Sequence, residues 1–354
     1  MHNLKKALIA SIAFLLVTAV MSIGLMEFYF RSEEDFYQDG SERAAYAGSL
    51  DYLICGASHA YRGMNPEEID ALLGTSGYNI SGGLMTMGGR YEMLRIEIER
   101  NPVKTVVLEL SYATMTRNRA DEGPEGDLYV LGRMDRFWDR FCYFFRGFRI
   151  SELPDVYERF LTEGIDALGK ALNGELRRSD TQRFRGYIPT GPRTIELETN
   201  YEERFHSKTP EKEFDPYNLK YLERILTYCE ERDIEVVFVT MPLTKTFLST
   251  YAELDYFYDW YRELAQAHGC RYYDFNLIKK KDEMFPDPVA FYDVLHLNDE
   301  GAETLSNLFA ELELRTAAGE DISGLFYSSY LEMESAPGFL EPWPEDLAED
   351  STGT

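Results

Sequence analysis

The chain has 354 residues, of which 44% are hydrophobic and 14% aromatic, so it is neither a disordered chain nor a miniature domain that depends on disulfides. Its 36 Lys and Arg stand against 62 Asp and Glu, which gives a formal net charge of −26. A field of that sign repels polyanions, which excludes a general affinity for nucleic acid, and we expect no nucleic-acid partner.

The first predicted element is a membrane-spanning helix over residues 7–30, a nearly uncharged run that only Glu27 interrupts. Its length suits a span and exceeds the apolar region of a cleaved signal peptide. Lys5 and Lys6 precede the run and acidic residues follow it, so the positive-inside rule places residues 1–6 in the cytoplasm. No Ala-x-Ala site lies near its outer end, which favours an uncleaved single-pass anchor over a signal peptide. We therefore expect the rest of the chain to lie outside the cytoplasm, at the cell membrane.

Beyond the span, a polar segment at residues 31–50 is interpreted as a stalk, and short apolar runs bounded by turn residues follow it. These runs are the predicted strands, at residues 51–56, 76–81, 103–111, 235–240 and 271–275. Helical patterns alternate with them, at residues 66–73, 86–99, 217–232, 251–268 and 298–312. Asn65 and Asn298 stand where the N-caps of two of these helices belong. The alternation predicts an α/β domain over residues 51–315, a three-layer sandwich with a parallel sheet and a site at the carboxyl ends of its strands.

The alternation stops at residues 112–215, a large insertion after the third strand that we expect to cap the strand-end site. Residues 137–148 form an aromatic run with interspersed Arg, for which helix packing inside the insertion and a contact surface are the two interpretations. A locally basic stretch follows, with Arg177, Arg178, Arg183, Arg185 and Arg193. The chain closes with an acidic segment, residues 316–354, that we expect to be largely disordered.

The first candidate functional residue is Ser58, which follows the first predicted strand in Ile54-Cys-Gly-Ala-Ser-His59. A serine flanked by small residues at that place exposes its hydroxyl at the sheet edge. The following amides and a helix N-terminus supply partial positive charge for an oxyanion. Such triplets are also common in ordinary strand-to-helix turns, so Ser58 alone establishes no function.

The second candidate element is Phe291-Tyr-Asp-Val-Leu-His-Leu-Asn298, directly before the last predicted helix. Asp293 and His296 are three residues apart, so one turn brings the carboxylate and the imidazole together. The carboxylate would fix the imidazole tautomer, which leaves the other ring nitrogen for a nucleophile. His59 adjoins Ser58, and we interpret it as structural because the side chains of neighbouring residues normally point apart.

Neither a metal nor a cofactor is expected. Glu109, Asp287 and Asp293 raise a metal or a glycosidase interpretation, but carboxylates near strand ends are common and these lack a regular ligand spacing. The four cysteines form no Cys-x-x-Cys pair. Whether Cys229 and Cys270 are joined by a disulfide stays open, because spacing does not decide it.

Together the two candidate elements resemble the SGNH (GDSL-like) hydrolase superfamily, including its membrane-anchored branch, which contains the teichoic-acid D-alanylation protein DltD and the alginate O-acetylation proteins. Gly56-Ala-Ser58 matches the block that holds the nucleophile, and Asp293-x-x-His296 matches the final block with acid and base. The resemblance covers residues 50–112 and 217–312 and implies a flavodoxin-like sheet.

The resemblance also implies where an oxyanion would be held. Asn79-Ile-Ser-Gly-Gly83 looks like the block whose glycine amide, from Gly82 or Gly83, serves the oxyanion beside the amide of Ser58. The family's asparagine after the third strand is missing, since the sequence there reads Leu108-Glu-Leu-Ser-Tyr112. Ser111 and Tyr112 are the candidate substitutes. Losing such a donor typically costs on the order of 100- to 1000-fold in rate, so the gap argues against fast general hydrolysis more than against the fold.

The sequence and the resemblance predict an extracytoplasmic O-acyl esterase or acyltransferase that acts through Ser58, His296 and Asp293. The expected substrate is a cell-surface glycan or envelope polymer, with a multi-span membrane acyltransferase as a partner. The alternative is a non-catalytic SGNH-like protein that binds a glycan or a partner in an acylation system, which the missing asparagine favours.

Overall fold

The computed structural model describes residues 2–32, 34–117, 119, 123–175, 184–191, 214–248, 254–287 and 289–336. The chain divides into two compact units. The sheet unit comprises Tyr46–Gly123 and Gln182–Thr354, and the anchor unit comprises Met1–Ala45 and Pro124–Thr181. The insertion predicted at residues 112–215 is therefore shared between the two units, and its role as a cap stays a prediction.

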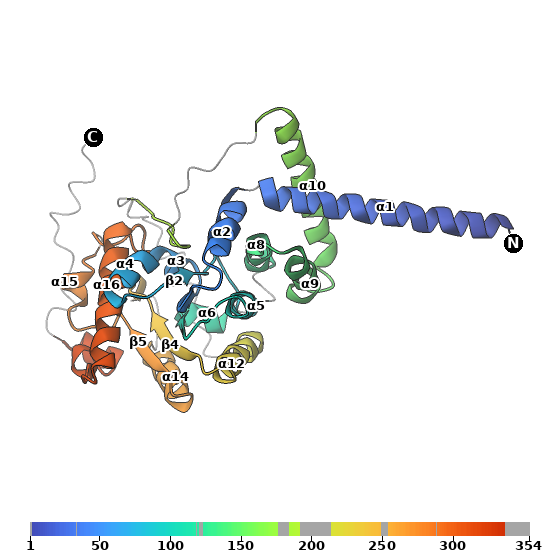
Figure 1. The fold of residues 1–354 in the computed structure, drawn as a ribbon. Helices are drawn as coiled ribbons and strands as arrows, with labels where there is room; N and C mark the ends of the chain where they lie inside the picture. The colour runs from blue at the N-terminus through green and yellow to red at the C-terminus, as the bar shows by residue number, and fades with distance from the viewer. Residues whose placement is uncertain are drawn as a thin grey trace. The chain divides into compact units, whose positions relative to one another are not determined.

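The sheet unit is built on a five-stranded parallel sheet in the order β2-β1-β3-β4-β5. Figure 1 draws the strands as arrows and labels β2, β4 and β5. The strands are β1 Tyr52–Cys55, β2 Gly77–Asn79, β3 Thr105–Glu109, β4 Glu235–Thr240 and β5 Arg271–Asp274. This confirms the predicted α/β class with a parallel sheet. The order is that of flavodoxin-like folds, in which ligands bind beyond the carboxyl ends of the strands where the order reverses, here between β1 and β3.

Helices cover both faces of the sheet, because side chains alternate along each strand. On β1, Ile54 belongs to the core that α4 and α16 cover, while the thiol of Cys55 contacts the Arg90 carbonyl of α5 on the other face. α16 packs on α3 and α4, and α5 packs on α12. The helical segments of this unit include α3 Ser58–Gly63, α4 Pro66–Leu73, α5 Met87–Ile98, α6 Tyr112–Thr116, α12 Pro216–Glu230, α13 Lys245–Leu248, α14 Leu254–Ala267, α15 Lys281–Met284, α16 Asp299–Ala317, the 3₁₀ turn η1 Ser323–Leu325 and α17 Tyr330–Glu334.

Two predicted helix starts are confirmed by their caps. The Asn65 side chain accepts the Glu67 amide at 3.1 Å, and the Asn298 side chain accepts the Gly301 amide at 2.9 Å. Such caps satisfy amides that have no partner inside the helix. Because Asn298 caps α16 and lies two residues after His296, this cap also holds one end of the loop that carries His296.

Residues 316–336, which we expected to be largely disordered, belong to the folded sheet unit. Tyr330 of α17 is buried, and its hydroxyl donates to Asp274 Oδ2 at 2.9 Å. Its amide donates to Asp255 Oδ1 at 2.6 Å. Met333 is buried beside it. A few apolar anchors in an acidic segment were therefore enough to extend the fold, and residues 337–354 lie outside the described residues.

The segment 184–191 returns from the insertion along β2, the strand at one margin of the sheet. The Arg185 carbonyl accepts the Asn79 amide at 2.9 Å, and the Arg185 guanidinium pairs with Asp70. Gly186 has a φ of 82°, and a Cβ there would lie 1.9 Å from the Asn79 carbonyl oxygen, so only glycine fits. The other four arginines of the predicted basic stretch lie outside the described residues.

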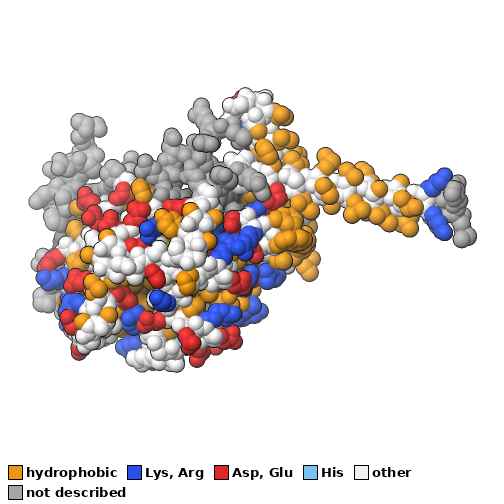
Figure 2. All heavy atoms as spheres, viewed as in Figure 1, with side chains coloured by type: hydrophobic (Ala, Val, Ile, Leu, Met, Phe, Trp, Pro, Cys, Tyr) orange, Lys and Arg blue, Asp and Glu red, His pale blue; other side chains and the backbone are white. Residues whose placement is uncertain are grey.

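The anchor unit is helical, with α1 His2–Ser32, α2 Glu34–Ala45, α8 Glu125–Arg133, α9 Phe137–Gly147 and α10 Leu153–Leu172. Within α1, Lys5–Phe30 is long and apolar enough to cross a membrane, and Figure 2 shows hydrophobic side chains along its length. α1 and α10 approach closely at Gly164, where a Cβ would lie 2.7 Å from the Leu25 carbonyl oxygen. The segment predicted as a stalk is largely helix α2.

All four cysteines are free thiols. Burial raises the pKa of Cys229 to about 12 and that of Cys270 to about 11, so both thiols stay protonated at neutral pH. The disulfide between them that spacing left open is not formed in this structure.

Candidate active site

Ser58 lies where the first strand leads into α3. β1 ends at Cys55, and Gly56 and Ala57 connect it to Ser58, the first residue of α3. Gly56 lets the chain pass close to the end of β3, since a Cβ there would lie 2.6 Å from the Glu109 Cβ. Gly56, one of the small residues that directed attention to Ser58, is therefore required by close packing on Glu109.

A buried ion pair lies next to this connection. The side chains of Glu109 and Arg90 are both fully buried, and Arg90 Nη2 lies 3.2 Å from Glu109 Oε2. The same Oε2 accepts the Ala57 amide at 2.9 Å, and Arg90 Nη1 donates to the Glu109 main-chain carbonyl. Glu109 therefore holds the residue before Ser58 by a charge-assisted hydrogen bond, while Arg90 offsets its charge.

Sequence reasoning missed the role of this pair and weighed Glu109 only as a metal ligand or a glycosidase carboxylate. The available signal was an acidic residue inside an otherwise apolar strand. In a parallel sheet with helices on both faces, such a side chain has to find a buried partner.

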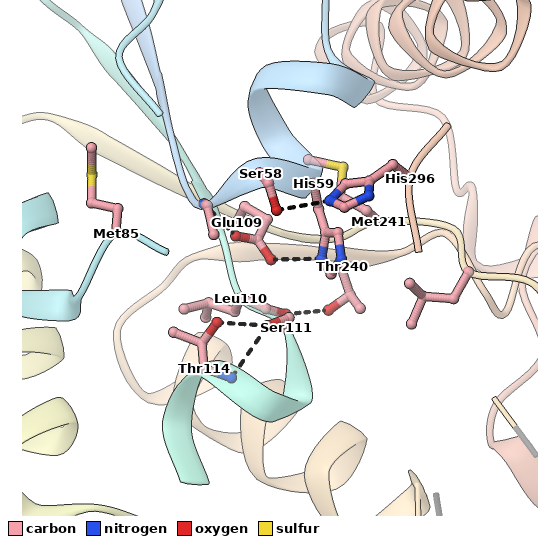
Figure 3. A network of polar contacts seen from close by, with 12 residues as sticks. Ser58, His59, Met85, Glu109, Leu110, Ser111, Thr114, Thr240, Met241 and His296 are labelled. Atoms are coloured by element: carbon pink, nitrogen blue, oxygen red, sulfur yellow. Dashed lines mark hydrogen bonds and ion pairs between the residues drawn. The ribbon is translucent and has the colours of Figure 1, made fainter. Parts of the chain in front are cut away.

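His296 lies between Ser58 and Asp293. Its Nε2 is 2.8 Å from Ser58 Oγ, the contact at the top of Figure 3, and its Nδ1 is 2.8 and 2.9 Å from the two Asp293 carboxylate oxygens. Asp293 Oδ1 also accepts the amides of Leu295 and His296, each at 2.8 Å, so one carboxylate fixes both the turn and the ring. The structure thus brings together the three residues that we predicted as nucleophile, base and orienting acid.

The electrostatics of Asp293 suit that arrangement. Burial tends to raise the pKa of Asp293, but hydrogen bonds from the His296 ring and from the Leu295 and His296 amides outweigh it, and the pKa lies below its usual value. The carboxylate is therefore ionised at neutral pH and favours the imidazole tautomer with its proton on Nδ1. In that tautomer Nε2 is free to accept the Ser58 hydroxyl proton.

Two backbone amides are candidates for holding an oxyanion. Among the described residues, the amides of Ser58 and Gly83 donate to no other group. The amide of Gly82 donates to the Gly56 carbonyl at 3.3 Å, which removes Gly82 from the predicted set. The next residue, Leu84, has a φ of 52° and is 56% exposed. A leucine in the left-handed region is strained, and such strain gathers at functional sites.

Ser111 has a different role from the one we expected. Its Oγ lies 2.6 Å from Thr114 Oγ1 and accepts the Thr114 amide at 3.2 Å, which caps α6. Figure 3 shows Ser111 beyond Glu109, away from Ser58. The hydroxyl of Tyr112 donates to Asp274 in the core. Neither residue therefore substitutes for the missing asparagine, because local capping and core packing occupy their hydroxyls.

His59 faces the site, although we expected its side chain to point away from that of Ser58. The His59 ring centroid is 5.2 Å from that of His296, and its Nδ1 is 4.0 Å from Glu109 Oε1 (Figure 3). The reason is that α3 begins at Ser58, and successive helical side chains diverge by about 100° rather than by the 180° of a strand. Desolvation, then the field of His296, lowers the pKa of His59 to about 3, so its ring is neutral at neutral pH.

Replacing His59 by glutamine should weaken the acid dependence of stability. The folded state holds His59 neutral with a pKa of about 3, whereas the unfolded chain binds a proton below about pH 6.5. His59 therefore contributes stability above pH 6.5 that is lost as pH falls toward 3. Between about pH 7 and pH 5, the free energy of unfolding should fall by about 2 kcal/mol more in the parent than in His59→Gln. Urea titrations of the detergent-solubilised chain measure this difference, and equal losses in the two proteins would contradict it.

No family model matches the sequence, and no curated protein matches it. Among solved structures, the crystal structure of a candidate acylhydrolase from Bacteroides fragilis aligns with 9% identity and a TM-score of 0.38, over 80% of this chain and 97% of that one. So distant a likeness carries no functional argument, and the function rests on the geometry of the site.

Proposed function

We propose that this chain is a serine esterase or O-acyltransferase with Ser58 as its nucleophile. The observation that carries the proposal is the unbroken relay from Ser58 Oγ through His296 to Asp293, with 2.8 Å on either side of the imidazole. A binding scaffold has no need for a hydroxyl, an imidazole and a carboxylate aligned in this order.

In the proposed reaction, Ser58 Oγ attacks the acyl carbonyl carbon and its proton passes to His296 Nε2. The carbonyl oxygen becomes an oxyanion that the amides of Ser58 and Gly83 stabilise. His296 then gives the proton to the leaving alcohol as the original ester bond breaks, which leaves an acyl group on Ser58. Water or a sugar hydroxyl then attacks the acyl carbonyl carbon and gives its proton to His296. The bond between the acyl group and Ser58 Oγ breaks as His296 returns the proton to Oγ, which restores Ser58. Asp293 remains ionised and stabilises the imidazolium in both halves.

We further propose that the site acts outside the cytoplasm on a cell-surface glycan or envelope polymer. The candidate span Lys5–Phe30 and the two lysines at its start support this orientation. The resemblance to the membrane-anchored SGNH branch, which includes DltD and the alginate O-acetylation proteins, supports the substrate class. A multi-span membrane acyltransferase that supplies acyl groups from the cytoplasm is the partner this proposal implies.

A fluorophosphonate probe tests the nucleophile. Applied to the detergent-solubilised full chain, the probe should modify Ser58, as located by mass spectrometry of the labelled peptide. Ser58→Ala should abolish the labelling and His296→Ala should reduce it strongly, because the hydroxyl then lacks its base. Ser76→Ala, a matched serine replacement elsewhere in the sheet unit, should label like the parent.

A parent protein that folds but shows no labelling at Ser58 overturns the catalytic proposal and favours the non-catalytic binding alternative. Where labelling succeeds, incubation with an acyl ester in the presence and absence of a sugar acceptor separates the two reactions. A rise in acylated sugar at the expense of free acid assigns a transferase, and an unchanged yield of free acid assigns an esterase.

A further inference from the structure

The aromatic helix α9 carries large apolar side chains on a face that the described part of the anchor unit leaves open. Trp138 is 69% exposed, Phe145 58% and Phe141 40%, and their rings contact one another in series. The helix is nevertheless fixed, because Tyr143 is buried and its hydroxyl donates to Asp127 at 2.6 Å. One side of the aromatic run thus packs inside the unit, while the other is a contiguous apolar surface of the kind that marks a contact site.

A cavity of about 320 Å³ lies between this helix and α1, inside the anchor unit. Its walls are mostly apolar side chains. From α1 they include Ile23, Met26 and Phe30, and from α9 they include Phe141 and Phe144. The exposed face of α9, the cavity and the candidate span are therefore parts of one continuous apolar surface.

The contacts between α9 and α1 determine how deep α9 would lie in a bilayer that α1 spans. The residues of α1 that line the cavity run from Ala19 to Phe30, which is roughly 16 Å of helix at about 1.5 Å per residue. The candidate span itself ends at Phe30. Since the hydrocarbon core of a bilayer is ~30 Å thick, a spanning α1 places α9 within the half of the bilayer nearest Phe30.

The one acidic residue in the span agrees with this depth. Glu27 Oε1 accepts Arg140 Nε of α9 at 2.8 Å, and the second carboxylate oxygen pairs with Arg140 Nη2. The Arg140 side chain is 8% exposed and that of Glu27 20%. A charge at membrane depth is strongly destabilising unless it is paired, so Glu27 inside an apolar span requires a cation at the same level. α9 supplies that cation.

We infer that α9 and the exposed apolar side of α10 are immersed in phospholipid acyl chains of the leaflet nearest Phe30, and that an acyl chain fills the cavity. This inference rests on the membrane anchoring proposed above. α10 continues the surface, with Ile165 60% and Leu172 81% exposed, and Figure 2 shows hydrophobic side chains gathered on this part of the anchor unit. The chain then contacts the membrane through α9 and α10 as well as through α1.

Quenching of Trp138 fluorescence by brominated lipids tests the inference. A full chain with Trp260→Phe and Trp343→Phe keeps Trp138 as its tryptophan, and one with Trp138→Phe and Trp343→Phe keeps Trp260 as the control in the sheet unit. Both are reconstituted into phosphatidylcholine vesicles with plain or brominated acyl chains. Trp138 emission should fall at least twofold in the brominated vesicles, and Trp260 emission should be unchanged.

Three outcomes overturn the inference, and each differs from the others. Unquenched Trp138 in a protein that resists alkaline extraction shows that α1 is inserted while α9 is not in lipid. Unquenched Trp138 together with efficient bis-maleimide cross-linking through Cys142, which is exposed on α9, assigns the face to a second copy of the chain. Release of the protein by alkaline extraction removes the proposed anchor itself, and this result leaves the Ser58 labelling test unaffected.

Discussion

Replacing Asp293 with asparagine should lower kcat for ester cleavage on the order of 10⁴-fold, with little change in KM. The asparagine oxygen can still accept the amides of Leu295 and His296, which reach Asp293 Oδ1 at 2.8 Å, so the turn is retained. Its NH₂ group is a donor, however, and would face Nδ1 of the imidazole. The ring proton then moves to Nε2, which can no longer accept the proton of Ser58.

Hydrolysis of a small acetate ester by the detergent-solubilised chain measures this effect. Asp255→Asn is the matched control, because Asp255 also accepts two backbone amides, those of Tyr330 and Leu331, but faces no imidazole in the described structure. Asp255→Asn should retain the parent kcat. A loss of less than about tenfold in Asp293→Asn, equivalent to about 1.4 kcal/mol, would show that His296 keeps its working tautomer without the carboxylate.

Replacing Arg90 with methionine should lower the free energy of unfolding by about 3–5 kcal/mol, because it leaves a buried carboxylate without its cation. Glu109 would keep the Ala57 amide at 2.9 Å but lose Arg90 Nη2 at 3.2 Å. The main-chain carbonyls of Glu109 and Met85 would also lose their arginine donors. The loss should therefore displace the connection that carries Ser58 as well as weaken the core.

Urea titration with a double variant separates the charge effect from the loss of packing. Arg90→Met combined with Glu109→Gln should recover at least about 1 kcal/mol relative to Arg90→Met alone, since the stranded charge is gone. Arg262→Met on α14 of the same unit is the matched control, because the Arg262 side chain is 41% exposed and its partner Asp259 50%, and it should cost less than about 1 kcal/mol. Equal destabilisation by Arg90→Met and Arg262→Met, or a double variant no more stable than Arg90→Met, would contradict the assignment.

Local patterns were enough to predict the sheet and the relay. The strands are short and covered on both faces, so they appear in the sequence as continuous apolar runs. Asn65 and Asn298 cap helices through hydrogen bonds to amides no more than three residues further along the chain. Ser58 was predicted as the nucleophile because small residues flank it directly after a strand. The Asp293 to His296 spacing works because one tight turn closes the contact.

The features that sequence reasoning missed depend on neighbours distant in the chain. Glu109 on β3 pairs with Arg90 on α5. No spacing rule relates an acidic residue on a strand to a basic residue on the helix before it. Ser111 looked like a donor to the site because of its position after β3, but the start of α6 gave its hydroxyl a closer partner in Thr114. His59 was misjudged because strand geometry was assumed for a residue that lies in a helix.

The segment 184–191 also bears on how copies of this protein behave side by side. β2 is an edge strand of the sheet. An uncovered edge strand offers its backbone amides and carbonyls to any extended chain, including β2 of another molecule. In this protein the Asn79 amide already donates to the Arg185 carbonyl. Gly186 also brings the backbone of the segment 184–191 close to the Asn79 carbonyl. The segment 184–191 therefore blocks the addition of a strand from another molecule at this edge of the sheet. Molecules concentrated in the plane of a membrane could therefore stand close together without polymerising edge to edge through β2.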